Sequence, residues 1–484
     1  MADHSDEDDD FESILRSFLS GSGPIDASRL AGAAGLPADP TGVAWLFASL
    51  QDAVRQGDDS IHWEPATQQA ERLAADGARP VDEKTSAGVD AAFHVAGLWL
   101  SETVQIAELT APPASMTRTE WVRQTMQLWV QMAEPVALSI SDAITRVFRE
   151  QAPEQLRGMA GGAEQAIRAV GGALFALQLG QVVGQLSREV VSGGDIGIPL
   201  LEAGRAGVVP QNIEGFGEGL DIPADQVQLY LAVRELAHAR LFRHARWLRL
   251  QMISAITAYA KGITIDTGQL QQLAEGFNPS NPDELRQILA DGTLIPPKSA
   301  AQEAALTRLE TTLALIEGWV DVVTRRATTR LPKSDAVAET VRRRRAIGGP
   351  AERAFATLVG LELRPRRLRE AAALWEAVTE AVGPEGRDAL WSHPDLLPTA
   401  ADLDDPTRLV DQLRERQAGH VPEPDDLDKA LADILAADGD GGDPSASGPG
   451  PAAGTGPQGP GPAQGPESSD DNDGPHGTGE PDRG

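Results

Sequence analysis

Apolar residues recur with helical spacing along most of the chain, whereas the alternation typical of a strand never extends beyond four or five residues. Proline and glycine separate the helical patterns from one another. The most regular patterns predict helices over residues 121–133, 163–191, 224–261, 301–326 and 368–382. We therefore expect a mainly α fold.

The same patterns divide the chain into four parts. Residues 1–10 are acidic, and residues 438–484 are rich in Gly, Pro, Asp and Ser. Both tails are expected to be disordered, because burial of so few apolar groups cannot offset the entropy lost on ordering. Residues 11–77 carry short amphipathic runs and are expected to form a small helical unit. Residues 89–437 are predicted to form a multi-helix core.

The composition excludes several classes of protein. The chain has no cysteine, so any metal must be held by His, Asp or Glu. A formal net charge of -30 disfavours nucleic-acid binding, since phosphate contacts need a basic surface. The chain begins without a signal-peptide pattern, and the apolar stretch over 169–186 carries Gln178, Gln181 and Gln185, which are costly in a membrane. We therefore expect a cytoplasmic protein that does not insert into membranes.

Small residues follow one face of the helix predicted over 163–191. Gly172, Ala176, Gly180 and Gly184 recur every four positions, so another backbone can approach this face closely. A glycine-rich phosphate-binding loop would need a strand–loop–helix context that this stretch lacks. The pattern therefore favours close helix packing.

The helix predicted over 224–261 carries the residues that suggest chemistry. Arg234, Glu235 and His238 occupy the zinc-protease signature H-E-x-x-H, with Arg234 in place of the first histidine. Arg234 and His238 are four residues apart and so share a helix face. In the intact motif two histidines at this spacing hold zinc, and the glutamate is the general base. By spacing alone, the pattern also fits a helix with surface charges and one satisfied histidine.

Two positions could supply a further metal ligand. His244 follows His238 by six residues, but Leu241 stands where the longer metzincin motif needs glycine, so the helix is expected to continue and turn His244 away. Glu317 interrupts an apolar stripe, and a carboxylate among core residues needs a partner. Glu317 is therefore either a ligand or a member of a buried salt bridge, with Arg234 as one candidate partner.

Four segments resemble, in this order, the zincin-like metallopeptidase type 2 family: 208–213, 234–242, 315–319 and 390–399. This bacterial family is labelled as hydrolases or zinc-dependent metalloproteases, and the resemblance covers roughly residues 93–413. It implies a zincin-like helical core with two histidines and a later glutamate as zinc ligands. Carried over by position, the resemblance makes Glu235 the base, His238 the second ligand and Glu317 the third, and it places Arg234 where the first ligand belongs.

Arginine cannot do the work of the missing histidine. It has no lone pair to offer and stays protonated. At about 4 Å and an effective dielectric of about 20, it would repel a divalent ion by roughly 8 kcal/mol. The sequence therefore predicts a degenerate site that lacks zinc and is inactive or weak as a protease, with Arg234 paired to Glu317 or Glu235. If zinc is bound instead, His238 and Glu317 are its ligands and Glu235 is the base.

Arg342, Arg343, Arg344 and Arg345 form a dense basic run in this acidic chain. The run could be a docking patch for an acidic partner, a solvated helix face balanced by nearby carboxylates, or a surface that the acidic tail covers. The alternative function is therefore a non-enzymatic interaction protein. It would bind a protein or peptide through this run or through the former active-site cleft.

Overall fold

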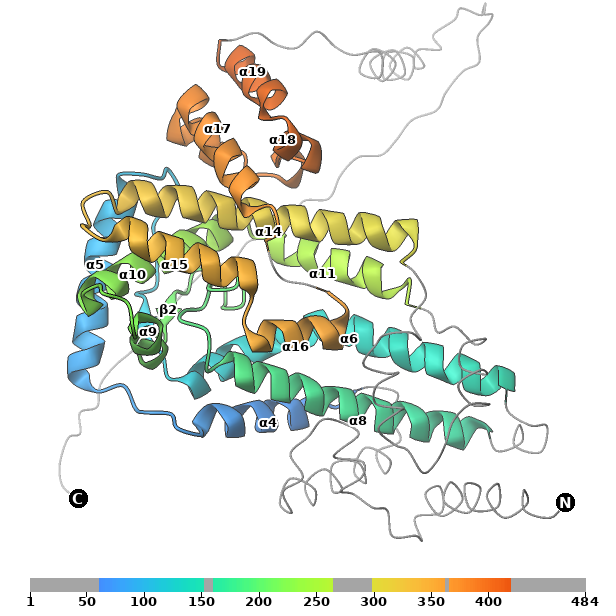
Figure 1. Cartoon of the computed structure of the whole chain (residues 1–484). Helices are drawn as coiled ribbons and strands as arrows, with labels where there is room; N and C mark the ends of the chain where they lie inside the picture. The colour runs from blue at the N-terminus through green and yellow to red at the C-terminus, as the bar shows by residue number, and fades with distance from the viewer. Residues whose placement is uncertain (1–60, 152–159, 264–297, 362–364, 419–484) are drawn as a thin grey trace, which may run out of the picture. The chain divides into compact units, whose positions relative to one another are not determined.

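Helices make up nearly all the regular structure of the residues that the computed structural model describes, which confirms the expected mainly α fold (Figure 1). The described residues are 61–151, 160–263, 298–361 and 365–418, and all belong to the unit Met1–Val421. The first helices are α4 (Glu64–Ala75), α5 (Glu83–Ser101), α6 (Arg118–Gln151), α8 (Ala160–Leu186), α9 (Pro210–Gly217), α10 (Ala224–His244) and α11 (Trp247–Ala260). The later ones are α14 (Ala300–Ala327), α15 (Ser334–Ile347), α16 (Pro350–Val359), α17 (Leu368–Ala389), α18 (Ala400–Asp404) and α19 (Pro406–Gln417), with the 3-10 helix η1 (Pro394–Leu396).

Two short strands, β1 (Ala114–Ser115) and β2 (Gly207–Val208), pair in parallel, and Ser192 forms an antiparallel bridge to Val208. Strand β1 contacts α5, and strand β2 contacts α10. None of the helices in the described ranges is both long and apolar enough to cross a membrane.

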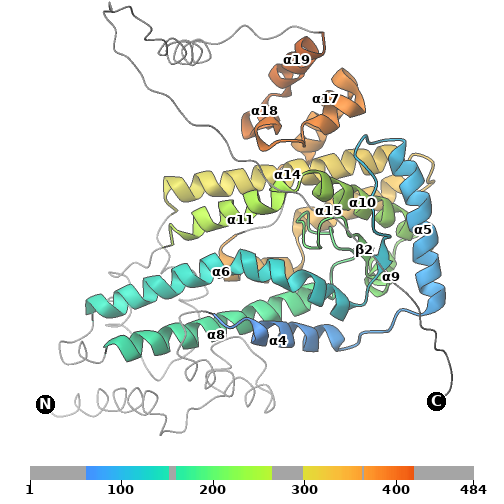
Figure 2. The same ribbon diagram turned by 180° about the vertical axis from the view of Figure 1, so that it is seen from behind.

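The buried apolar residues form two cores. The first gathers around α5, α10, α14 and α17, and the second around α4, α6, α8 and α11. Helix α14 serves both: Leu309 and Leu313 pack in the second core, whereas Leu315 and Trp319 pack in the first. Figures 1 and 2 show α14 beside α11, and α8 beside α6 and α4, from opposite sides. Glu317 therefore lies just after the point where α14 passes from one core to the other.

The prediction of a single helix over 224–261 is wrong, because the structure has two helices there, α10 and α11. Ala245 leaves the helical conformation, with φ -95° and ψ 64°. No glycine or proline marks this break. Its cause is tertiary: α10 packs against α5 and α14, whereas α11 packs against α14 and α6. By contrast, α17 is interrupted where the helix predicted over 368–382 ends, since Gly383 has a φ of 73° and Pro384 follows; a second helical stretch then continues to Ala389.

The small residues of α8 confirm the close packing that their spacing predicts. A Cβ atom at Gly180 would lie 2.4 Å from the carbonyl oxygen of Ala66, and one at Gly184 would lie 2.7 Å from Cβ of Leu73. Both neighbours belong to α4, so the two helices approach each other at backbone distance. The short side chains of α8 are what permit that approach.

Only residues 61–77 of the small unit expected over 11–77 are described, and their helix α4 packs against α8 and α6. The tails predicted over 1–10 and 438–484 lie outside the described residues. The domain boundaries stay predictions.

We expect Gly180→Ala to destabilise the protein although alanine is the better helix former. The new methyl group meets the α4 backbone, and overpacking of this kind costs about 1–3 kcal/mol. Gly171→Ala is the matched control in the same helix, because its Cβ would meet nothing closer than 4.0 Å. It should gain up to about 1 kcal/mol from helix propensity. Equal urea unfolding midpoints for the two variants would contradict the packing argument.

Candidate functional site

Helix α10 carries the motif through the interior of the protein. Every residue from Tyr230 to Phe242 is buried, so the motif does not lie on a solvated helix face. Asp225 lies in the first turn and Arg243 in the last turn, so the signs of both charges are favourable to the helix dipole. Charged groups inside this run must be paired, because an isolated buried charge is very costly. The partners of Arg234, Glu235 and His238 therefore define the site.

Arg234 pairs with Glu317 of the neighbouring helix α14. Its Nη2 atom lies 2.7 Å from Oε2 of Glu317, and both side chains are almost completely buried. A capping box at Ser299 begins α14, which brings Glu317 to α10 about five turns later. Burial favours a neutral Glu317, but Arg234 and then Arg345 outweigh it and hold the pKa of this carboxyl well below its usual range. Glu317 is thus an ionised carboxylate in the protein interior.

His238 contacts the other oxygen of the same carboxylate. Its Nε2 atom lies 3.2 Å from Oε1 of Glu317, and its Nδ1 atom lies 3.1 Å from the carbonyl oxygen of Arg234. Burial, and then the nearby Arg234, lowers the pKa of His238, so the ring is neutral. A neutral ring carries one N–H group, and we assign it to Nε2 because a hydrogen bond to an ionised acceptor is the stronger one. In this tautomer Nδ1 carries a lone pair and cannot donate to the carbonyl oxygen of Arg234, so the hydrogen bond of the ring is the one from Nε2 to Glu317.

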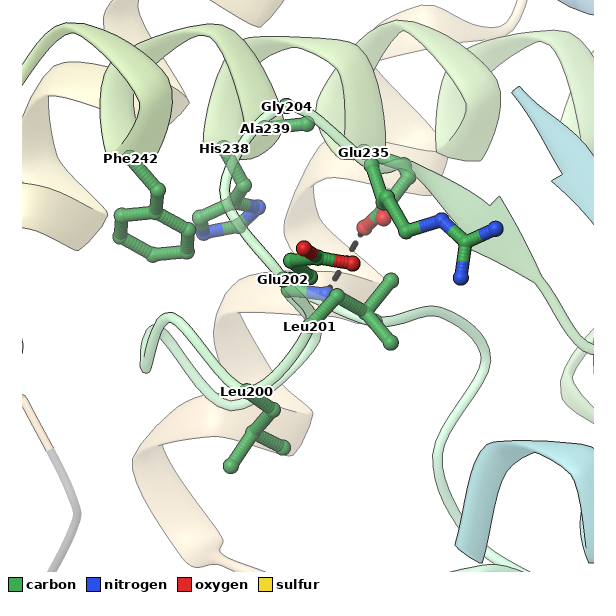
Figure 3. A pocket seen from close by; sticks show the side chains of 11 residues that line it. Leu200, Leu201, Glu202, Gly204, Glu235, His238, Ala239 and Phe242 are labelled. Carbon is green, nitrogen blue, oxygen red and sulfur yellow. Dashed lines mark hydrogen bonds between the residues drawn. The ribbon is translucent and has the colours of Figure 1, made fainter. Parts of the chain in front are cut away.

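Glu235 points to a different partner. Its two carboxylate oxygens accept hydrogen bonds from the backbone N–H groups of Gly194, at 2.8 Å, and Gly207, at 3.0 Å. Figure 3 shows one of these bonds at the pocket. Burial raises the pKa of Glu235 to about 7, although these backbone hydrogen bonds oppose the shift. Glu235 therefore ties α10 to the backbone at Gly194 and to strand β2 at Gly207.

The covering segment, residues 190–201, is buried throughout and lies directly on the motif side chains. A Cβ atom at Gly194 would lie 2.6 Å from Cβ of His238, and one at Gly197 would lie 2.6 Å from Oε1 of Glu317. Gly197 also has a φ of 74°, which favours glycine. This segment was not among the site residues predicted from the sequence. The feature of the sequence that could have indicated it is the cluster Gly193, Gly194 and Gly197 just after a long helix.

Three of the four arginines of the basic run are paired within the chain. Arg342 binds Asp321 at 3.0 Å, Arg344 lies 3.1 Å from Asp195, and Arg345 contacts Glu317 and Glu352. Arg343 is exposed. These ion pairs favour the interpretation that nearby carboxylates balance the run. The docking role stays a prediction.

A small pocket lies at the site. Glu235, His238 and Phe242 of α10 line one side of it, and Leu201 and the exposed Glu202 lie opposite them (Figure 3). The enclosed space holds about one water molecule. The covering segment fills the volume in which a larger ligand would have to lie.

These residues do not fit a zinc ion. The described ranges hold no group of three His, Cys, Asp or Glu side chains placed for a metal. His238 and Glu317 meet, but Arg234 binds the second oxygen of Glu317, and both oxygens of Glu235 accept backbone N–H groups. His244 is exposed at the end of α10 and contributes nothing to the site.

The fold and the buried motif helix define a zincin-like protein. Residues 61–410 match the profile of the zincin-like metallopeptidase family, so the chain belongs to that family, as the four sequence segments predicted. A search of curated proteins gives no match. A solved structure from Chloroflexus aurantiacus, described as "a putative hydrolase with a novel fold", is similar at 18% identity and a TM-score of 0.50. The similarity covers 73% of this chain and 99% of the other, and it concerns the fold alone.

The raised pKa of Glu235 predicts a specific pH dependence of stability. Between pH 4.5 and about 7 the folded protein binds more protons at this group than the unfolded chain does, so the contribution of Glu235 falls as the pH rises. The free energy of unfolding of the wild type should therefore fall relative to Glu235→Gln, by at most about 3 kcal/mol across this window. Urea unfolding at several pH values measures the difference.

Glu202→Gln is the control, because it removes an exposed carboxylate at the same pocket. It should not reproduce the pH dependence expected for Glu235→Gln. At low pH, Glu235→Gln itself should cost about 1–3 kcal/mol, because the amide nitrogen cannot accept from Gly194 or Gly207. A difference between wild type and Glu235→Gln that is flat or rises with pH would refute the assigned shift.

Proposed function

We propose that this protein is a metal-free member of the zincin-like metallopeptidase family that is inactive or weak as a protease. The contact of 2.7 Å between Arg234 Nη2 and Glu317 Oε2 carries the proposal. A guanidinium replaces an imidazole at the first ligand position, and its positive charge neutralises the carboxylate that a zinc ion would otherwise bind. Helices α10 and α14 are held together at this position by an ion pair.

The chemistry of peptide hydrolysis supports this proposal. Zinc lowers the pKa of its bound water from about 15.7 to about 7, and a site without zinc has no such nucleophile. Glu235 cannot compensate, because without zinc a water beside it would keep a pKa of about 15.7, far above the pKa of about 7 of this carboxyl. The pocket above His238 also has no room for a peptide.

A zinc enzyme would need several changes at once. Arg234 would have to leave Glu317, and His238 would have to offer Nε2 as a lone pair. Glu235 would also have to release Gly194 and Gly207. Each change breaks a buried hydrogen bond or ion pair, so the structure supports the metal-free form better.

The alternative of an interaction protein has less support at this site. The former cleft is filled by the covering segment, and the paired arginines leave only Arg343 of their run exposed. A protein or peptide partner and a cytoplasmic location stay predictions.

We expect the purified full-length protein to contain far less than one zinc per chain after dialysis, as measured by elemental mass spectrometry. Treatment with EDTA should leave the Tm unchanged, and so should later addition of zinc, because a ligand that binds only the folded state would raise the Tm. One tightly held zinc per chain, with a Tm that falls on chelation, would overturn the proposal.

The ion pair should show a large coupling in a double-mutant cycle of Arg234→Met and Glu317→Gln. Arg234→Met alone should cost about 3–5 kcal/mol, because it removes the closest partner of a buried carboxylate. The double variant should lose less than the sum of the two single variants, by about 1–3 kcal/mol. Equilibrium urea unfolding measures each variant.

The exposed pair Arg330–Glu102 is the matched control, with Arg330→Met and Glu102→Gln. Both its side chains are 58% exposed, so their coupling should stay within about 0–1 kcal/mol. A coupling at Arg234 and Glu317 no larger than this value would show that the buried pair does not hold the site together.

A further inference from the structure

A second guanidinium reaches the same carboxylate from another helix. Arg345 of α15 is buried, and its Nε atom lies 3.7 Å from Oε2 of Glu317, the oxygen that Arg234 also contacts. Its Nη1 atom binds Glu352 of α16, and its Nη2 atom donates a hydrogen bond of 2.9 Å to the carbonyl oxygen of Ile196. Glu317 therefore lies between two arginines that come from different parts of the chain.

Two positive charges lie at the carboxylate of Glu317. Zinc brings two positive charges, and Arg234 and Arg345 together bring the same two, since arginine stays protonated. Glu317, and after it Glu352 and Asp195, raise the pKa of Arg345 against the effect of burial, so this arginine stays charged. Glu317 thus faces two guanidinium groups, whose summed charge equals that of a divalent ion.

We propose that Arg345 is the second half of the metal replacement, so that two guanidinium groups together stand in for the ion and each one by itself is enough to exclude it. This inference rests on the proposed function, in which Arg234 replaces the first ligand. It goes further because it predicts that restoring the histidine does not restore the metal.

Arg345 also links the replacement to the covering segment. Its bond to Ile196 fixes the residue beside Gly197, whose backbone lies against Glu317. Its bond to Glu352 reaches α16, which packs against α8 and contributes Phe355 to the second core. The same side chain therefore supplies charge at Glu317 and holds the segment that closes the pocket.

Zinc binding to four proteins tests the inference: the wild type, Arg234→His, Arg234→His with Arg345→Gln, and Arg234→His with Arg343→Gln. The last is the matched control, because it removes one positive charge from the same run at an exposed position. Calorimetric titration with zinc alone gives the affinity, and elemental analysis gives the stoichiometry. The histidine variant with Arg345→Gln should bind one zinc at least about a hundredfold more tightly than the other two variants.

The outcomes separate the two proposals. If Arg234→His alone binds zinc as tightly as its combination with Arg345→Gln, the role of Arg345 is refuted and the role of Arg234 stands. If the combination binds no zinc, the inference is refuted, and so is the idea that Arg234 replaces a ligand, because the remaining groups are then not arranged to hold the ion. If the wild type binds one zinc tightly, the proposed function itself fails.

A measurement without zinc covers the case in which the combined variant does not fold. In the otherwise unchanged chain, Arg345→Gln and Glu317→Gln should each lower the urea midpoint, and the two together should lower it by less than the sum of their shifts. Shifts that simply add would mean that Arg345 and Glu317 act independently, and the inference would be overturned.

Discussion

The ionised carboxylate of Glu317 is the group on which the site depends. Moving a carboxylate from water into the protein interior costs several kcal/mol even after relaxation, so it persists there only with close positive or hydrogen-bonding partners. Arg234, His238 and Arg345 supply those partners from α10 and α15, while Glu317 itself comes from α14. Three helices must therefore keep their relative positions to keep this charge satisfied. The ion pair lies where α14 passes from one hydrophobic core to the other, so it also helps to fix α14 at the junction of the two cores.

Replacement of a metal by ion pairs changes what holds such a site together. A structural zinc ion contributes about 10–16 kcal/mol of apparent binding free energy at neutral pH. A buried ion pair contributes far less, because desolvation offsets most of the attraction, although removal of one partner is costly. The pairs at Glu317 are better understood as fixing position than as a source of stability. The bulk of the stability must come from the apolar cores, in which five tryptophans are fully buried.

Local sequence patterns predicted the parts of the structure that local forces decide. Helical periodicity gave the mainly α fold, and the four-residue spacing of Gly180 and Gly184 indicated the close contact with α4. For Arg234 the sequence left two candidate partners, Glu317 and Glu235, because only the folded chain decides which carboxylate is within reach. The structure pairs Arg234 with Glu317. The break at Ala245 carries no local signal, since the neighbours of α10 and α11 cause it. The contact of Arg345 with Glu317 joins residues on different helices, so no local pattern predicts it. From the sequence, Arg345 was interpreted only as a member of the basic run.

Helix geometry explains why one replacement changes the roles of two adjacent residues. Successive residues of an α-helix point about 100° apart, so Arg234 and Glu235 face different surroundings although they are neighbours. In a zinc site both directions converge on the ion and its water. Here Arg234 turns to the carboxylate of α14, whereas Glu235 accepts the backbone N–H groups of Gly194 and Gly207. Without an ion to join the two directions, the ligand position becomes a link between helices, and the base position becomes an anchor for the segment that closes the pocket.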